Sequence, residues 1–373
     1  MNGNSSQHEN DGRIKPGIRK TIWDDLHRKD LGKNIRRDFD DLYEFFIDKE
    51  TQKRLASKGR VKRFFSTGFQ LFRVLILRLS PTRRILLVLS IIVMWLGNST
   101  IQFDSSNISF HFSIFGFILI LLILMLELKD KLLARSELEA GRVVQSALMP
   151  KENPVLSGWS IWLFSRPAND VGGDLVDSIP LSDNRLGIAL GDIAGKGLGA
   201  ALLMSKLQST LRALAPYFPS LSELGTRLNE IFCRDSIPSR FASLAYLEIS
   251  SDCGAIRLLN AGHLPPLIVR HGEIEQLKSV APALGIMPDA EFIEQHIELG
   301  PHETMIVYSD GLTEAQNRNG DFFGDDRFHR LILTMSSAGC ADIGKQLLIE
   351  VDRFIGDAYP SDDLSLVILK RES

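Results

Sequence analysis

Four aspartates stand beside glycine or a second aspartate at the borders of apolar runs. Asp174 follows two glycines in VGGDLVD, Asp192 ends LGIALGD, Asp310 ends MIVYSD, and Asp362 with Asp363 opens DDLSLVIL. A single Asp-Gly pair is typical of an ordinary turn. Strand ends at one edge of a sheet bring distant residues together, and glycine lets a ligand approach the backbone closely. We therefore expect these acids to form one cluster.

The chemistry of such a cluster follows from its donor atoms. Carboxylates without a histidine or cysteine companion suit Mg²⁺ or Mn²⁺ and poorly suit zinc or copper. Four negative charges would also balance two divalent cations. Two such ions can convert a bridging water into hydroxide near neutral pH and neutralise phosphate oxygens during in-line attack. Hydrolysis of a phosphoester is the reaction that this pattern favours.

The elements that must position these acids alternate between strand-like and helix-like patterns across residues 150–373. Short β-rich runs are joined by tight turns, and helical patterns are fewer. This arrangement favours an α+β fold, with antiparallel sheets flanked by helices, over a doubly wound parallel sheet. The predicted strands are 160–164, 186–190, 243–249, 255–260, 266–269, 305–308 and 364–369, and the predicted helices are 199–214, 220–232 and 341–354.

Residues 1–82 differ in composition from the rest of the chain. Residues 1–20 are polar and predict a disordered tail, and apolar residues at helical spacing between Leu31 and Phe46 predict an amphipathic helix. The stretch 51–84 has basic and aromatic residues and no acid. Its place before an apolar run favours contact with anionic lipid headgroups. Nucleic-acid binding is the alternative that this stretch leaves open.

Residues 83–127 predict a transmembrane hairpin. The uncharged runs 85–103 and 108–126 are separated only by the segment 104–107. A bilayer needs about 20 mostly apolar residues per helix. Lysine and arginine flank the pair on its outer ends, which places both chain ends in the cytoplasm by the positive-inside rule. Residues 128–149 continue as a linker helix with an approximate apolar seam, so a homodimer through this helix is one possibility.

The overall composition excludes several other classes of protein. The chain has 373 residues and a formal net charge of −3. Its three cysteines, Cys233, Cys253 and Cys340, lie far apart without metal-ligand spacing. A disulfide scaffold and a structural zinc site are therefore excluded.

Seven motifs in order resemble one known family. They are VGGDLVD (171–177), GDIAGKGLGAALLM (191–204), NAGHLPPL (260–267), ALGI (283–286), YSDGLTEAQN (308–317), FFG (322–324) and DDLSLV (362–367). This set resembles the PPM-type metal-dependent serine/threonine protein phosphatases, and within them the bacterial SpoIIE/RsbU-like branch. The resemblance implies an α-β-β-α sandwich that holds two Mn²⁺ or Mg²⁺ ions.

The resemblance also implies roles for individual residues. Asp192 would bridge the two metals while the backbone carbonyl of Ile193 binds one of them. Asp310 and Asp362 would be further metal ligands, and Asp174 would contact a metal or its water. Catalysis would depend on Asp192, Asp310 and Asp174. Asp363 and Asp177 are candidates for support behind the ligands, with a solvated turn as the alternative.

Three basic residues have two interpretations each. His263 could serve as a general acid, although its place before two prolines favours a structural role in a turn. Lys196 and Arg166 could approach a phosphate or be ordinary surface cations.

The sequence therefore predicts a membrane-anchored phosphatase of the bacterial cytoplasmic membrane, multi-pass, with the N-terminus and the phosphatase domain in the cytoplasm. It would hydrolyse phosphoserine or phosphothreonine by attack of a metal-bound hydroxide. The resemblance suggests a phosphorylated anti-sigma-factor antagonist as substrate, in a partner-switching pathway. The alternative is a non-catalytic membrane scaffold that binds a phosphoprotein. Membrane lipids are the other expected partner, and no nucleic acid is expected.

Overall fold

The computed structural model describes residues 60–96, 98–103, 106–182, 184–235, 240–278 and 281–372. The tail predicted at 1–20 and the amphipathic helix predicted at 31–46 lie outside these residues. The chain divides into two compact units, Met1–Asp130 and Lys131–Ser373.

The first unit contains helices and one small sheet. Its described elements are α4 (Arg60–Arg78), α5 (Pro81–Trp95), β1 (Asn98–Phe103), β2 (Ser106–His111) and the first part of α6 (Phe112–Leu148). Ser80 caps α5 because its side chain accepts a hydrogen bond from the Arg83 amide at 3.4 Å, and Pro81 occupies the first helical turn. Helix α6 begins in this unit and ends in the second.

The segment between α5 and α6 differs from the prediction. Residues 98–103 and 108–111 were expected within membrane helices, whereas they lie in the antiparallel strands β1 and β2. The Ser, Asn, Thr and Ile residues here have low helix propensity, which explains the early end of α5. Among the described residues, α6 is the one helix that is long and apolar enough to cross a membrane. The structure therefore does not confirm a two-helix transmembrane hairpin.

Helices α5 and α6 nevertheless pack against each other in antiparallel fashion. A Cβ atom on Gly116, near the start of α6, would lie 2.9 Å from the Ser90 carbonyl oxygen and 3.0 Å from Met94, near the end of α5. At the other end, Arg83 pairs with Glu127 and Asp130. Only glycine permits so close an approach of the two backbones.

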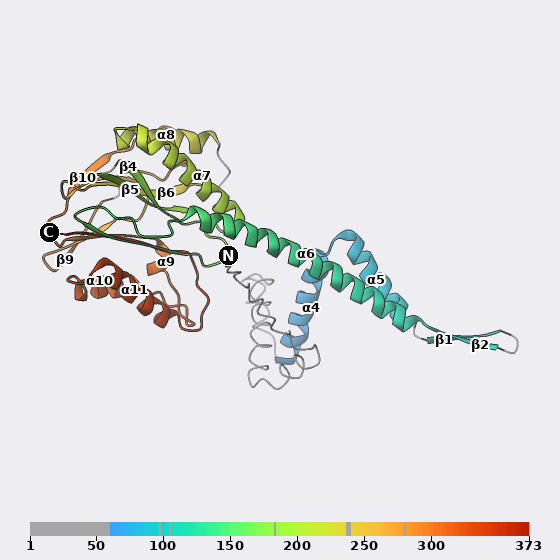
Figure 1. The fold of residues 1–373 in the computed structure, drawn as a ribbon. Helices are drawn as coiled ribbons and strands as arrows, with labels where there is room; N and C mark the ends of the chain where they lie inside the picture. The colour runs from blue at the N-terminus through green and yellow to red at the C-terminus, as the bar shows by residue number, and fades with distance from the viewer. Residues whose placement is uncertain are drawn as a thin grey trace, which may run out of the picture. The chain divides into compact units, whose positions relative to one another are not determined.

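The second unit has two five-stranded antiparallel sheets (Figure 1). Sheet 1 has the order β10-β7-β6-β5-β4 and sheet 2 the order β3-β12-β11-β8-β9. The strands are β3 (Trp159–Arg166), β4 (Leu175–Ser182), β5 (Arg185–Ile193), β6 (Ala242–Ser250), β7 (Ala255–Ala261), β8 (Leu267–Arg270), β9 (Glu273–Gln276), β10 (Glu294–Glu298), β11 (Thr304–Tyr308) and β12 (Leu364–Arg371).

Helices cover the outer face of each sheet (Figure 1). The helices are α7 (Leu198–Leu214), α8 (Leu221–Arg234), α9 (Asp310–Thr313), α10 (Asp325–Thr334) and α11 (Cys340–Ile355). One apolar cluster joins α7 and α8 to sheet 1, a second lies between the sheets, and a third joins α10 and α11 to sheet 2. The result is the four-layer α-β-β-α sandwich that the family resemblance implied.

The predicted strands and helices of this unit are all present, and the prediction lacks the strands β4, β9 and β10 and the helices α9 and α10. Strand β4 contains Pro180 and a register shift next to it. Strands β9 and β10 are edge strands with mostly polar side chains. Because β9 and β10 bury little apolar surface, they lack the apolar periodicity by which a strand is predicted from sequence.

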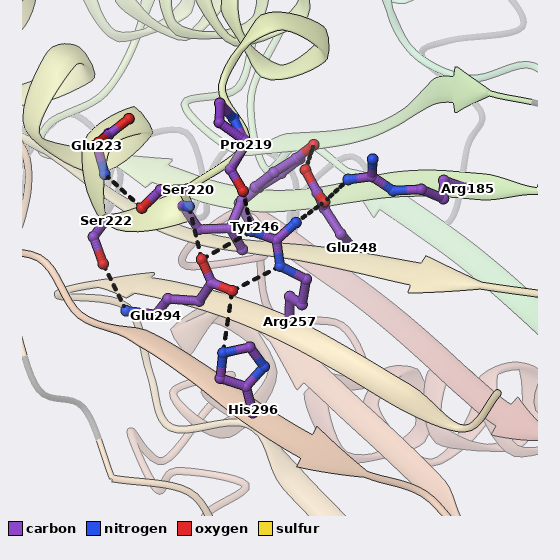
Figure 2. Close-up of polar contacts among 11 residues, drawn as sticks. Arg185, Pro219, Ser220, Ser222, Glu223, Tyr246, Glu248, Arg257, Glu294 and His296 are labelled. Carbon is purple, nitrogen blue, oxygen red and sulfur yellow. Dashed lines mark hydrogen bonds and ion pairs between the residues drawn. The ribbon is translucent and has the colours of Figure 1, made fainter.

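A polar network fastens the start of α8 to sheet 1 (Figure 2). Arg257 pairs with Glu248 at 2.9 Å and with Glu294 at 2.7 Å. Glu294 in turn accepts a hydrogen bond from the Leu221 amide at 2.8 Å, in the first turn of α8. The buried Glu248 is thereby paired, and the helix position is fixed relative to the strands.

Candidate metal centre

The first pair of acids lies at one end of sheet 1. Asp174 directly precedes β4, and Asp192 lies near the end of β5. Because these strands are antiparallel, with Leu175 opposite Gly191, the start of one adjoins the end of the other. Asp174 is buried, at 3% exposure. Two acids that are 18 positions apart in sequence are thus neighbours.

The second pair occupies the matching position in sheet 2. Asp310 follows β11 as the first residue of α9, and Asp362 precedes β12. Register again explains their proximity, since Tyr308 lies opposite Leu366. The Lys196 ammonium group, from the turn after β5, lies 2.9 Å from the Asp362 carboxylate and 2.6 Å from the Ser361 carbonyl oxygen. This contact joins the Asp192 turn to the Asp362 turn.

The four carboxyl groups act on one another electrostatically. Burial, together with the charges of Asp310 and Asp362, raises the pKa of Asp192 to about 6. Burial raises the pKa of Asp174 well above its usual value, and the charge of Asp192 adds to this effect. Burial and the charge of Asp362 also raise the pKa of Asp310. Like charges this close disfavour full ionisation unless a cation joins them.

The donor set fits a hard divalent cation. The Asp174 Oδ2 atom is buried without a hydrogen-bond partner. A Cβ atom on Gly173 would lie 3.2 Å from the Ile193 carbonyl oxygen, so the absence of a side chain there lets the Asp174 loop approach that carbonyl. In the described part of the chain, no three histidine, cysteine or acidic side chains are arranged to hold a metal ion as they stand. Lys196 meets one of the expected ligands instead.

Asp363 supports the loop that carries Asp174. Its Oδ1 accepts a hydrogen bond from the Ala168 amide at 2.7 Å, and its Oδ2 accepts hydrogen bonds from the amides of Gly173 at 2.5 Å and Asp174 at 3.4 Å. With both oxygens engaged by backbone amides, this carboxylate ties β12 to the loop before β4. Asp363 is therefore a supporting residue, and Asp362 beside it faces the other acids.

Three further polar side chains of the site are absent from the predicted site residues, although Ser309 and Ser365 lie inside the motifs YSDGLTEAQN and DDLSLV. The Ser309 hydroxyl donates to the Asp363 carbonyl oxygen at 3.1 Å, and the Ser365 amide donates to the Ser309 hydroxyl at 2.9 Å. Hydrogen bonding by Ser365 and Ser309 favours the charged form of Asp174 and lowers its pKa, against the effect of burial. Gln145, in the last turns of α6, binds the backbone of Gly172. Serine and glutamine are too common for sequence spacing to single them out.

Two other charged residues have structural partners. Asp177 is fully buried, and it forms hydrogen bonds of 2.7 Å with both Nε and Nη2 of Arg212 on α7. Arg166 makes a bidentate ion pair with Asp352 on α11, at 3.0 and 2.6 Å. Arg166 is thus engaged away from the acids, which favours the surface-cation interpretation.

His263 is buried between the sheets, at 4% exposure. Burial lowers the pKa of His263 to about 4, so the ring is neutral at physiological pH. A buried neutral imidazole is a poor proton donor to a leaving group. This favours the structural interpretation of the residue over a general acid.

A four-layer sandwich with acids at matching sheet ends is the architecture of a PP2C phosphatase domain. The SiaA-PP2C domain of Pseudomonas aeruginosa superposes with a TM-score of 0.56 and 17% sequence identity, covering 65% of this chain and 99% of that one. At this level of identity the likeness shows the fold alone.

Sequence comparison defines the family more narrowly. The family model described as stage II sporulation protein E (SpoIIE) matches residues 182–372, and the chain belongs to this family. Protein IcfG of Synechocystis sp. is 31% identical over 275 residues, which is 66% of this chain and 43% of that protein. The phosphoserine phosphatase RsbU of Bacillus subtilis is 26% identical over 242 residues, which is 64% of this chain and 71% of RsbU. The chain thus spans less than half the length of IcfG.

Proposed function

We propose that this chain is a membrane-anchored, metal-dependent protein phosphatase that hydrolyses phosphoserine or phosphothreonine on a signalling protein. The observation that carries the proposal is the meeting of Asp174, Asp192, Asp310 and Asp362 at matching ends of two sheets. Burial and mutual repulsion raise the pKa of the first three of these acids. Such a cluster is costly to maintain unless a cation compensates it.

The residues that would hold the cations are Asp192, the Ile193 carbonyl, Asp310 and Asp362, with Asp174 contacting an ion or its water. Two Mn²⁺ or Mg²⁺ ions bound here would activate a water molecule and neutralise the phosphate oxygens. Asp363 holds the Asp174 loop in place through three backbone amides. The Ser309 hydroxyl links the backbones of Asp363 and Ser365.

The substrate that we propose is a phosphorylated antagonist of an anti-sigma factor. Membership of the SpoIIE family and the likeness to the phosphoserine phosphatase RsbU support this choice. An intact acid set favours an enzyme over a scaffold that only binds a phosphoprotein.

Hydrolysis of p-nitrophenyl phosphate and of a phosphoserine protein by the purified full-length chain tests the proposal. We expect Mn²⁺-dependent turnover that Asp310→Asn reduces by about 100-fold or more, because a ligand contributes several kcal/mol of transition-state stabilisation. Asp252→Asn, an exposed acid in the β6–β7 turn, is the matched control. Equal rates for the parent and Asp310→Asn would refute the metal assignment, and phosphoprotein binding without turnover would favour the scaffold.

The outward faces of α5 and α6 carry exposed apolar side chains, and these support the proposed membrane anchoring. Ile85, Trp95 and Phe117 are exposed, whereas Ser90 and Gly116 are buried between the helices. Small residues inside and large apolar residues outside are typical of helices packed in lipid. The 15 residues of α5 extend about 22 Å, less than the bilayer core of about 30 Å, so we propose that α5 inserts as the partner of α6.

Cell fractionation tests this anchoring. We expect the full-length chain to stay in the membrane pellet after an alkaline carbonate wash, because integral helices resist this treatment whereas surface-bound proteins are released. The basic helix α4 would then lie against anionic headgroups. Release by carbonate would overturn the integral anchor, and strongly salt-dependent retention on DNA without lipid would favour the nucleic-acid alternative.

A further inference from the structure

The turn after β7 directs an imidazole between the two sheets. The Asn260 side chain accepts a hydrogen bond from the His263 amide at 2.9 Å, which closes the turn. Gly262 has φ +65°, and a Cβ atom there would lie 2.4 Å from the Ala283 amide nitrogen. Glycine is therefore required at this position, and the turn has little freedom to move. The orientation of His263 is fixed by the backbone that carries it.

The imidazole contacts the strand next to Asp192. Its Nδ1 lies 2.9 Å from the Ser243 hydroxyl oxygen on β6. Ser243 lies directly opposite Asp192 in the β5–β6 register, and its hydroxyl is 3.4 Å from the Asp192 carbonyl oxygen. His263 is thus linked to the backbone of Asp192 through a single side chain.

The same ring also contacts the strand that leads to Asp310. The backbone of Tyr308, the last residue of β11, interacts with the imidazole, although Nε2 forms no hydrogen bond of good geometry. Tyr308 stands two positions before Asp310 and belongs to sheet 2. One side chain therefore contacts β6, the neighbour of the strand that carries Asp192, and β11, the strand that leads to Asp310.

We propose that His263 is a positioning residue that sets the separation of Asp192 and Asp310 across the two sheets, and through it the affinity of the site for a divalent cation. This inference rests on the proposed function. A histidine that only filled the core would contact apolar neighbours and would leave cation affinity unchanged when a ring of similar size replaced it. Residues behind metal ligands typically affect metal affinity by about 10- to 100-fold.

Isothermal titration of the purified full-length chain with Mn²⁺ tests the proposal, together with thermal unfolding in EDTA. His263→Phe keeps an aromatic ring and removes both nitrogens, and Ser243→Ala removes the hydroxyl that links the ring to Asp192. We expect each to weaken Mn²⁺ binding by about 10-fold or more. Ser243→Thr, which retains the hydroxyl, should bind as the parent does.

His329→Phe is the matched control, because His329 on α10 also has a buried Nε2 without a partner. Parent-like Mn²⁺ binding by both His263→Phe and Ser243→Ala would overturn the inference while leaving the phosphatase proposal intact. Equal weakening in Ser243→Thr and Ser243→Ala, with a matching fall in metal-free unfolding temperature, would also overturn it, since general destabilisation would then explain the loss. If the parent itself binds no Mn²⁺, the proposed function fails and this inference fails with it.

Discussion

The side-chain amide of Gln145 forms hydrogen bonds with both the backbone carbonyl and the backbone amide of Gly172. Its Nε2 donates to the Gly172 carbonyl oxygen at 2.7 Å, and its Oε1 accepts from the Gly172 amide at 3.1 Å. Gln145 is buried in the last turns of α6, and Gly172 stands two positions before Asp174. The end of the linker helix is thereby joined to the loop that carries a candidate ligand.

Replacing Gln145 by leucine should loosen this loop. The variant keeps a similar volume but leaves two buried backbone groups unpaired, at about 1–3 kcal/mol for each. We expect a lower unfolding temperature and a higher Mn²⁺ requirement for phosphatase activity. Val144→Ala, at the exposed neighbouring position, is the control and should behave as the parent. An unchanged Mn²⁺ requirement in Gln145→Leu would show that the clamp does not reach the site.

The helical phase between the proposed membrane segment and Gln145 should also affect the proposed phosphatase activity. One residue inserted after Arg135 rotates everything beyond it by about 100°, whereas seven residues restore nearly the same face. We expect the single insertion to change the activity of the full-length chain in membranes, and the seven-residue insertion to change it much less. Assays of both in membrane vesicles, at equal protein level, compare them directly. Identical activity of the two insertions would contradict transmission through the helix.

Metal-free stability should fall as the pH rises through the range where Asp192 loses its proton. The folded state holds this proton with a pKa of about 6, against an ordinary value of 3.8. Between these values the folded state binds more protons than the unfolded state, so the free energy of unfolding decreases with rising pH. Thermal unfolding in EDTA from pH 4 to 7 measures this trend.

Asp192→Asn removes one titrating group and should make the decrease shallower, with Asp174 and Asp310 still contributing to it, and at pH 7 it should unfold a few degrees above the parent. Asp252→Asn should follow the parent curve. Parallel curves for Asp192→Asn and the parent would show that burial of this carboxyl does not govern the pH dependence.

Lys196 should compete with a cation for Asp362. Its ammonium group lies 2.9 Å from that carboxylate, and a second positive charge nearby repels a divalent ion. We expect Lys196→Gln to bind Mn²⁺ more tightly than the parent, by several-fold, in calorimetric titration. Lys151→Gln, an exposed lysine before β3, controls for the change in net charge. Weaker binding by Lys196→Gln would instead assign this lysine to holding Asp362 in place.

The residue pattern predicts the antiparallel strands, the flanking helices and the candidate acids of residues 150–373, and the family resemblance implies the four layers. Short continuous apolar runs such as 305–308 mark the central strands because both faces of these strands are buried. Aspartates next to glycine mark the strand ends because those turns need backbone freedom. Polar edge strands such as β10 were not predicted because they bury little apolar area. The apolar residues of 98–111 predicted helix, whereas the chain forms β1 and β2 there.

The roles of several polar residues depend on contacts between elements that are far apart in the chain. The resemblance leaves Asp363 between a supporting role and a solvated turn. In the structure its carboxylate accepts hydrogen bonds from backbone amides near Asp174, while the adjacent Asp362 faces Lys196. Likewise, strand register places Ser243 opposite Asp192, and the packing of α6 places Gln145 against Gly172. Contacts between residues far apart in the chain depend on how whole elements pack, and no local spacing encodes them.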